Sequence, residues 1–143
     1  MTTKVVGNDV VRSLTDAWNS HDAARVGALY TDGATLLDPF YAEPLVGRSA
    51  IQMDAADFFI AFPDLAFRPT KVIADGTTVV VEVLSSGTNT GPLQLPAGPS
   101  PATSRRVEFS VASVIDLDAA GRIREERRYF DVAGLLMQLG LMP

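Results

Sequence analysis

The sequence contains no cysteine and only one histidine among its 143 residues. Without cysteine the chain can form no disulfide, thiol nucleophile or thiolate metal site. A single histidine excludes every site that needs two histidine ligands. The chain also lacks a glycine-rich phosphate loop, a Gly-x-Ser-x-Gly elbow and a cluster of metal-ligating residues. We therefore expect neither a cofactor nor a metal, and the remaining chemistry is proton transfer by aspartate or simple ligand binding.

Long apolar runs and basic patches are also missing. No segment approaches the roughly 18 apolar residues of a membrane-spanning helix, and residues 1–6 contain no apolar core of a signal peptide. The net charge of −5 argues against binding to nucleic acid or to an anionic membrane. The most basic stretch, 122–128, intersperses its arginines with Glu125 and Glu126, and we interpret it as a solvated or interface-facing strand. We expect a cytoplasmic protein.

The length suits one domain, spanning 1–143, and a content of 47 % hydrophobic residues is enough for a core. Apolar residues at helical spacing predict three helices before residue 63 and a short fourth helix after Asp131. The first three are 8–20, 23–31 with Asp22 as N-cap, and 47–62 with Ser49 as cap. A short apolar strand, 34–38, separates the second helix from the third and stops at Pro39.

From residue 65 onward the apolar pattern changes to a period of two. This pattern predicts four strands, at 65–73, 77–87, 105–117 and 122–130, with hairpin turns at 75–76 and 120–121. Long alternating strands are typical of a strongly curved antiparallel sheet that has one face on the core. Helices followed by such a sheet define an α+β fold, here a cone of curved sheet wrapped around the N-terminal helices. The mouth of the cone forms a pocket.

The stretch 91–101 is rich in proline and glycine, and we expect this composition to exclude regular structure. Its apolar side chains predict that it packs against the domain. It is either a plain long hairpin loop or a lid over the pocket.

Two aspartates stand out as candidates for chemistry. Asp38 directly follows the apolar strand and precedes aromatic residues, and burial there would raise its pKa towards the range of a general base. The alternative is a turn residue that binds local N–H groups. Asp131 lies where the last strand meets the last helix, and its alternative role is to cap that helix.

Weaker candidates are a lone histidine, a pair of charges and three tyrosines. His21 lies between two helices, where a structural role is the usual one. Arg106 and Glu108 lie two residues apart on one strand face and resemble ordinary surface charges. The tyrosines, which are phenolic donors or packing residues, are Tyr30, Tyr41 and Tyr129.

Taken together, several motifs resemble the SnoaL-like polyketide cyclases and ketosteroid isomerases of the nuclear transport factor 2-like superfamily. The similarity extends over nearly the whole chain, from Val10 to Leu141. The motifs that carry it are 17–22, 29–39, 47–51 and 121–136. The resemblance implies the same cone-shaped α+β barrel, often called cystatin-like.

The resemblance also implies roles for particular residues. Asp38 matches the base of ketosteroid isomerases, but Leu14 and Ser113 stand near the positions of their two oxyanion donors. Asp131 matches the acid/base of the cyclases, which act by intramolecular aldol condensation. Some cyclases carry a histidine on the preceding strand, and the corresponding stretch, 111–114, has none.

The predicted function is cofactor-free acid/base catalysis on a flat hydrophobic carbonyl compound, such as a polyketide or a steroid-like molecule. The expected catalytic residues are Asp131 first and Asp38 second. The residues expected to bind the substrate are Trp18, Phe40, Tyr41, Phe58, Phe59, Phe62, Ser113, Ile115 and Tyr129.

Two other functions stay open. The first is a non-catalytic module of the same fold that binds a small molecule. The second is activation of water as in epoxide hydrolases, with Arg106, Glu108 and Asp131 as a loose match to an Asp-Arg-Asp set. We also expect a homodimer that buries the outer face of the sheet, a face with mixed apolar and charged character. The residues expected on that face are Val80, Glu82, Leu84, Glu108, Val114 and Arg128.

Overall fold

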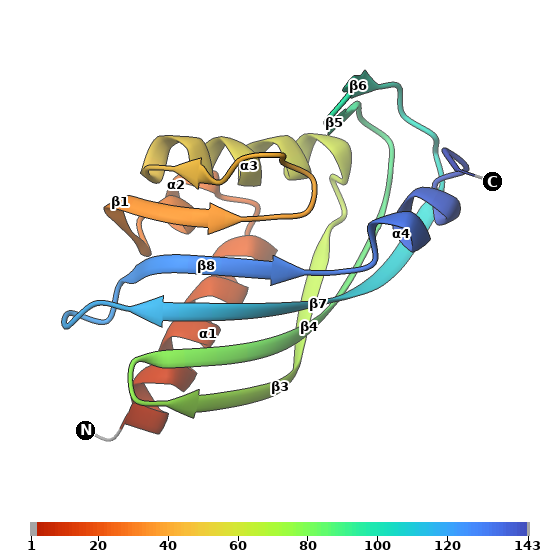
Figure 1. Cartoon of the computed structure of the whole chain (residues 1–143). Helices are drawn as coiled ribbons and strands as arrows, with labels where there is room; N and C mark the ends of the chain where they lie inside the picture. The colour runs from red at the N-terminus through yellow and green to blue at the C-terminus, as the bar shows by residue number, and fades with distance from the viewer. Residues whose placement is uncertain (1–2, 143) are drawn as a thin grey trace.

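The computed structural model describes residues 3–142, and these form four helices and eight strands. The helices are α1 (Thr3–Asn19), α2 (Ala23–Gly27), α3 (Arg48–Ala61) and α4 (Val132–Gln138). The strands are β1 (Tyr30–Leu37), β2 (Leu45–Val46), β3 (Ala66–Asp75), β4 (Thr78–Thr88), β5 (Leu93–Leu95), β6 (Gly98–Ser100), β7 (Arg106–Leu117) and β8 (Ile123–Tyr129). The mixture of N-terminal helices and a curved sheet confirms the predicted α+β class (Figure 1).

Six of the strands form one sheet in the order β2-β1-β8-β7-β4-β3. The pairs β3–β4, β4–β7 and β7–β8 are antiparallel, as predicted for the curved sheet. Strand β1 differs because it joins β8 in parallel, so the sheet is mixed rather than purely antiparallel. This parallel pair places the end of β1, and with it Asp38, beside the end of β8.

The helices cover one face of the sheet and enclose the core. Helix α1 crosses the sheet and packs mainly on β3, whereas α3 packs on α2 and β1 (Figure 1). The predicted apolar stripe of α1 is buried, with Trp18 at its end and Ala17 fully enclosed. Apolar burial of this extent is the main source of the fold's stability. The opposite face of the sheet is left uncovered by helices (Figure 1).

Some helix limits differ from the prediction. Helix α2 ends at Gly27 instead of residue 31, because Tyr30 already pairs with Ile123 in the sheet. Helix α3 has Gly47 as its N-cap rather than Ser49, and no side chain caps it. Asp22 does cap α2, since its carboxylate accepts a hydrogen bond from the Arg25 N–H at 3.1 Å. Helix α1 starts five residues earlier than predicted.

The segment 91–101 is regular, contrary to the prediction, because β5 and β6 pair as a small antiparallel hairpin. Pro99 fits there because a two-stranded hairpin has free edges on both sides. Buried Asn89 fixes the segment to the end of α3. Its side-chain amide donates to Ala61 O at 3.1 Å and to Gly91 O at 2.9 Å.

The sequence prediction also placed Arg128 on the outer face, and this is wrong. In the β7–β8 hairpin the register shifts by one residue between Asp116 and Leu117, which leaves Arg124 as an extra residue in β8. Beyond this bulge Arg128 lies opposite Ser113 on the inner face. The other residues expected outside, such as Val80 and Val114, pair with each other across the outer face.

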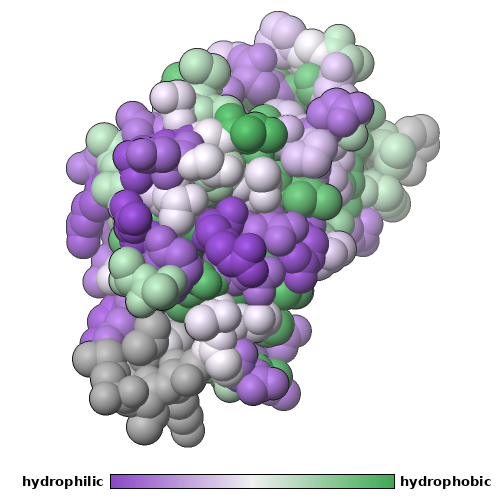
Figure 2. Space-filling model, turned by 60° about the vertical axis from the view of Figure 1, so that its left-hand side comes forward, coloured by the Kyte–Doolittle hydropathy of each residue, from purple (hydrophilic) through white to green (hydrophobic). Residues whose placement is uncertain are grey.

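The surface view in Figure 2 shows mostly polar residues, with apolar residues in small groups between them. Among the described helices, none is both long enough and apolar enough to cross a membrane. The start of the N-terminal stretch judged for a signal peptide, residues 1–2, lies outside the described residues.

Close packing of the β5–β6 segment on α3 gives a first prediction. A Cβ atom at Gly91 would lie 1.9 Å from the backbone oxygen of Ile60, so Gly91→Ala forces the backbone to move. We expect a loss of about 1–3 kcal/mol in the free energy of unfolding, measured with denaturant. Gly33→Ala is the matched control, because nothing lies within 4 Å of its Cβ position. Equal stability of the two variants would contradict this packing.

Candidate functional site

A cavity of about 70 Å³ lies between the inner face of the sheet and helices α1 and α3. Its wall is mainly apolar, with polar side chains at Thr15, at Ser85 and around Arg128. The residues that line it are Val11, Leu14, Thr15, Trp18, Asp38, Phe58, Leu65, Phe67, Val81, Val83, Ser85, Phe109, Val111, Ser113, Glu126, Arg128 and Phe130. This volume is well below the roughly 300–1,000 Å³ of a typical ligand site, so it admits a slim ligand or part of a larger one.

Arg128 is the centre of a buried ionic cluster in the cavity wall. Its Nη1 donates to Asp38 Oδ2 at 3.1 Å and to Asp54 Oδ2 at 2.8 Å. Its Nε donates to Glu126 Oε2 at 3.2 Å. The side chain of Arg128 is 9 % exposed, and those of its three partners are at most 2 % exposed. The guanidinium carbon also lies 5.4 Å from the centre of the Trp18 ring.

Neutral donors complete the coordination of the carboxylates. Tyr30 Oη and Ser113 Oγ both donate to Glu126, the latter at 3.0 Å. Tyr41 Oη donates to Asp54 Oδ1 at 2.7 Å. The Phe40 N–H donates to Asp38 Oδ1 at 2.8 Å, which is the local turn interaction expected for an aspartate before proline. Asp38 therefore has both of its predicted environments, because it binds a local N–H group and also lines the cavity.

The charges of the cluster do not balance. One guanidinium faces three carboxyl groups, so full ionisation would leave excess negative charge in an apolar interior, which is costly. Burial raises the pKa of Asp38 above its ordinary value, even though the Arg128 charge acts in the opposite direction. Protonation of Asp38 relieves the excess charge. Asp38 is thus able to take up and release a proton closer to neutrality than an exposed aspartate.

The neighbouring groups are held in fixed protonation states. Burial, together with the charges of Glu126 and Asp54, raises the pKa of Tyr30 well above its ordinary value. The pKa of Tyr41 is raised by burial and by Asp54 in the same way. Burial lowers the pKa of Arg128, but the charges of its carboxylate partners outweigh this effect and raise it. Both phenols therefore remain donors, and Arg128 remains a cation.

One nitrogen of Arg128 makes no hydrogen bond within the cluster. Its Nη2 makes no hydrogen bond to any residue that the structure describes, whereas Nε and Nη1 are both occupied. Arg128 lines the cavity as well as an outer groove of about 330 Å³. Asp38 and Phe130 also line both spaces. The other residues of the groove are Leu37, Pro39, Tyr41, Ala42, Glu43, Pro44 and Tyr129.

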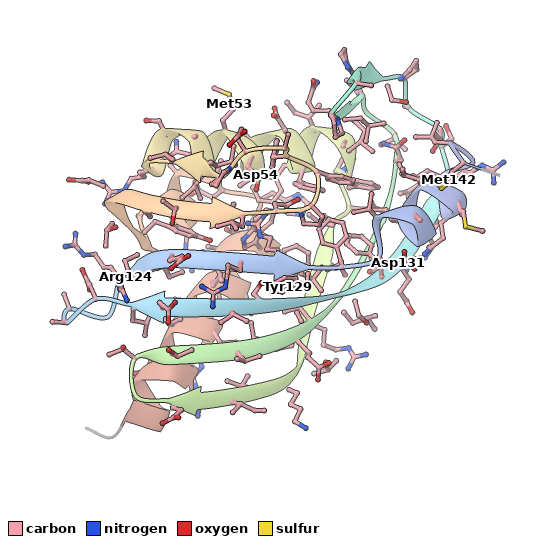
Figure 3. The ribbon with its side chains drawn as sticks, viewed as in Figure 1. Met53, Asp54, Arg124, Tyr129, Asp131 and Met142 are labelled. Carbon is pink, nitrogen blue, oxygen red and sulfur yellow. The ribbon has the colours of Figure 1, made fainter. Side chains whose placement is uncertain are left out.

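Asp131 lies elsewhere. It is the N-cap of α4, and its Oδ1 accepts a hydrogen bond from the Gly134 N–H at 2.9 Å. Figure 3 shows it where β8 passes into α4, well away from Asp54 on α3. It lines neither the cavity nor the outer groove. The structure thus does not bring the two candidate aspartates together.

The other residues expected to bind a substrate fall into three groups. Those that line the cavity are Trp18, Phe58 and Ser113. Those that line the outer groove are Tyr41 and Tyr129. Those that pack without lining either space are Phe40, Phe59, Phe62 and Ile115.

The weaker candidates also lie away from the cavity. His21 stacks on Phe59, and its Nε2 lies 2.7 Å from Leu65 O, so its role is structural. Arg106 and Glu108 are exposed at the start of β7. The described residues contain no group of three or more metal-ligating side chains suited to hold a metal.

Sequence reasoning did not identify Asp54, Glu126 and Arg128 as site residues. Asp54 had a visible signal, because it lies in phase with Ile51, Ala55 and Phe58 on the buried stripe of α3. Glu126 and Arg128 had only an indirect signal. Charges on both faces of the last strand indicate a bulge, but the position of the bulge, at Arg124, decides which residues face inward.

Comparisons with known proteins agree with this fold. Residues 8–139 match the family model of the SnoaL-like polyketide cyclases, and the chain belongs to this family. A comparison with curated proteins gave no match.

Several solved structures share the fold at low sequence identity. TsrD from Streptomyces laurentii superposes with a TM-score of 0.84 at 17 % identity, over 99 % of this chain and 100 % of that one. A second structure is a hypothetical protein from Catenulispora acidiphila with a ketosteroid isomerase-like fold, in complex with trimethylamine. It superposes with a TM-score of 0.77 at 19 % identity, over 94 % of this chain and 93 % of that one. The third structure is SalBIII, an epoxide hydrolase/cyclase-like enzyme with a role in pyran ring formation in the polyether salinomycin. It superposes with a TM-score of 0.76 at 21 % identity, over 92 % of this chain and 95 % of that one.

The charge imbalance of the cluster gives a second prediction. Arg128→Met removes the only cation of the described residues that contacts the three carboxyl groups, and we expect a loss of about 3–5 kcal/mol in unfolding free energy near neutral pH. Without Arg128 the pKa of Asp38 rises further above its unfolded value. The folded state then binds more protons than the unfolded state, so stability falls as pH rises. Denaturant unfolding in acid and at neutral pH should therefore show a smaller loss in acid.

Arg124→Met is the matched control. Arg124 lies on the same strand but is exposed, as Figure 3 also shows. We expect its stability to stay within about 0.5 kcal/mol of the parent. A similar loss in both variants would show that the ionic cluster is not the cause.

Proposed function

We propose that this protein catalyses cofactor-free proton transfer on a mostly hydrophobic carbonyl compound, with Asp38 as the general acid/base. The observation that carries the proposal is the position of Asp38, whose carboxyl has a raised pKa and lines an apolar cavity beside Arg128. A base of this kind is most effective when its pKa lies close to the working pH. Membership of the SnoaL-like family favours polyketide (aldol) cyclisation or a ketosteroid-type isomerisation as the reaction class.

In this proposal Arg128 takes the role of the missing oxyanion donors. Leu14 offers no donor to the cavity, and the Ser113 hydroxyl is already bound to Glu126. The Nη2 of Arg128 has no hydrogen-bond partner among the described residues, so it is available to donate to an oxygen on which negative charge develops. The three carboxylates hold the guanidinium in one position, so little reorganisation is needed when charge develops.

The proposed reaction begins when ionised Asp38 removes a proton from the carbon next to the carbonyl. The electron pair of the broken C–H bond forms a C=C bond to the carbonyl carbon, and the π electrons of the carbonyl move to its oxygen. That oxygen accepts a hydrogen bond from Arg128 Nη2. In an isomerisation the protonated Asp38 then returns the proton to another carbon. In an aldol cyclisation the carbon attacks a second carbonyl of the same molecule, and Asp38 protonates the resulting alkoxide.

A second reaction class has its own support. Asp38, Arg128 and Asp54 form a carboxylate–guanidinium–carboxylate set, which is the type of arrangement that activates water towards an epoxide. This set replaces the one considered from the sequence, whose members Arg106 and Glu108 are exposed. The similarity of fold to SalBIII is in keeping with it. Ligand binding without turnover is the competing non-enzymatic function.

The test uses benzylacetone as a probe ketone in heavy water. We expect the protein to accelerate exchange of the hydrogens next to the carbonyl, followed by NMR, and Asp38→Asn to slow it on the order of 100-fold because Asn is no base. Hydrolysis of styrene oxide by the same two proteins tests the epoxide reaction. Binding of the ketone without any exchange would contradict the catalytic proposal and favour a binding module.

Asp131→Asn is the matched control. Asparagine caps a helix about as well as aspartate does, so this variant keeps α4 intact while it removes the carboxylate. We expect exchange within about twofold of the parent, since a surface change of this kind has little effect on stability. Loss of exchange in Asp131→Asn alone would assign the acid/base role to Asp131, as the family resemblance suggested.

We further propose that the protein forms a homodimer through the outer face of the sheet. Ile73, Val80 and Val114 form an apolar row across three adjacent strands on that face, and Ile73 is 53 % exposed. We expect the mass of a dimer by light scattering at micromolar concentration and the mass of a monomer for Val80→Glu. Ala120→Glu, in the β7–β8 turn, should leave the dimer intact. A monomeric parent protein would refute this proposal.

A further inference from the structure

The hydroxyl of Ser85 is a polar group that the proposed mechanism does not use. Ser85 is fully buried on β4, and its Oγ has no hydrogen-bond partner among the described residues. Among the described residues, it is the one fully buried side-chain oxygen or nitrogen that lacks a hydrogen-bond partner. A buried donor without a partner costs free energy, so its presence calls for a physical reason.

Ser85 lines the same cavity as Arg128 but at a different level. The register of β4 and β7 arranges the inner face in three successive rows, which are Val81–Ser113, Val83–Val111 and Ser85–Phe109. Arg128 lies opposite Ser113 and therefore belongs to the first row. At about 3.3 Å per residue, the third row is about 13 Å along the strand from the first.

The cavity thus has a polar group at two separate levels and an apolar row between them. The middle row, Val83–Val111, carries only hydrocarbon side chains, and Phe58, Phe67 and Phe130 are among the other walls. Arg128 contributes to the cavity wall at one level and Ser85 at the other, so a ligand long enough to span the cavity contacts both residues.

We infer that Ser85 is a specificity-determining residue, which hydrogen-bonds a hydroxyl or carbonyl oxygen at the far end of a slim, elongated ketone. The inference rests on the proposed function, since it takes the reacting carbonyl to lie at Arg128. It narrows the substrate class to molecules with an apolar middle and an oxygen at both ends. Sites built around a buried hydrogen-bonding group discriminate strongly against analogues that lack the matching group.

The test compares two probes that differ in one oxygen. Raspberry ketone carries a phenolic hydroxyl at the end opposite its ketone, and benzylacetone is the same molecule without that hydroxyl. We expect the parent protein to bind raspberry ketone about tenfold more tightly by isothermal titration calorimetry. In Ser85→Ala this preference should disappear, while the affinity for benzylacetone stays the same.

Ser86→Ala is the matched control, because Ser86 is the next residue on β4 and points to the opposite face. It should keep the preference for raspberry ketone. Thermal unfolding provides a separate check, since Ser85→Ala removes an unpaired hydroxyl and should be no less stable than the parent. A clear loss of stability would assign Ser85 a structural role and overturn the inference.

The outcomes separate this inference from the proposed function. Equal affinity of the parent protein for both probes, together with hydrogen exchange in benzylacetone, overturns the role of Ser85 and leaves the role of Asp38 intact. A preference for raspberry ketone over benzylacetone that persists in Ser85→Ala also overturns the role of Ser85. If neither probe binds, the cavity is not a site for such ketones, and both the proposed function and the inference fail.

Discussion

The structure depends on the pairing of one buried cation, Arg128, with the carboxyl groups around it. Arg128 is placed among three carboxylates inside an apolar core, and such an arrangement is stable only when every group is well paired. The partners come from separate parts of the chain: Asp38 follows β1, Asp54 is on α3, and Glu126 is on β8 itself. The cluster therefore joins the parallel β1–β8 pair to the helix that covers it.

The sequence predicts the scaffold better than the cluster, for a physical reason. Apolar periodicity is repeated over many residues, so the buried stripe of α1 and the long strands β3, β4 and β7 are evident from the pattern alone. The inward face of β8 depends on a single bulge. Ile123 faces the core, and simple alternation from it would turn Glu125 and Arg127 inward instead of Glu126 and Arg128. Charged residues occupy both faces of a regularly alternating strand over 124–128, which indicates a bulge but does not show where it lies.

The two candidate aspartates also show that local sequence does not determine which residues face the cavity. Asp38 and Asp131 each follow a strand, and each accepts a hydrogen bond from a nearby N–H group, so local sequence does not separate them. The two aspartates differ in the residues that the sheet pairing brings next to them. The parallel pairing of β1 with β8 brings Asp38 to Arg128, whereas Asp131 follows the end of β8 and caps an exposed turn of helix. Long-range pairing, which periodicity does not specify, thus decides which carboxyl faces the cavity.

The arrangement also explains how a shared fold admits different chemistry. Solved structures that superpose over nearly the whole chain have about one residue in five in common with it, so very different sequences form this fold. The polar groups of the cavity are few, and each sits at a defined level of the inner face. Leu14 and Ser113 offer no free donor here, but Arg128 reaches the same space from β8. The fold alone therefore does not determine the function, which has to be argued from the few polar residues at inward positions.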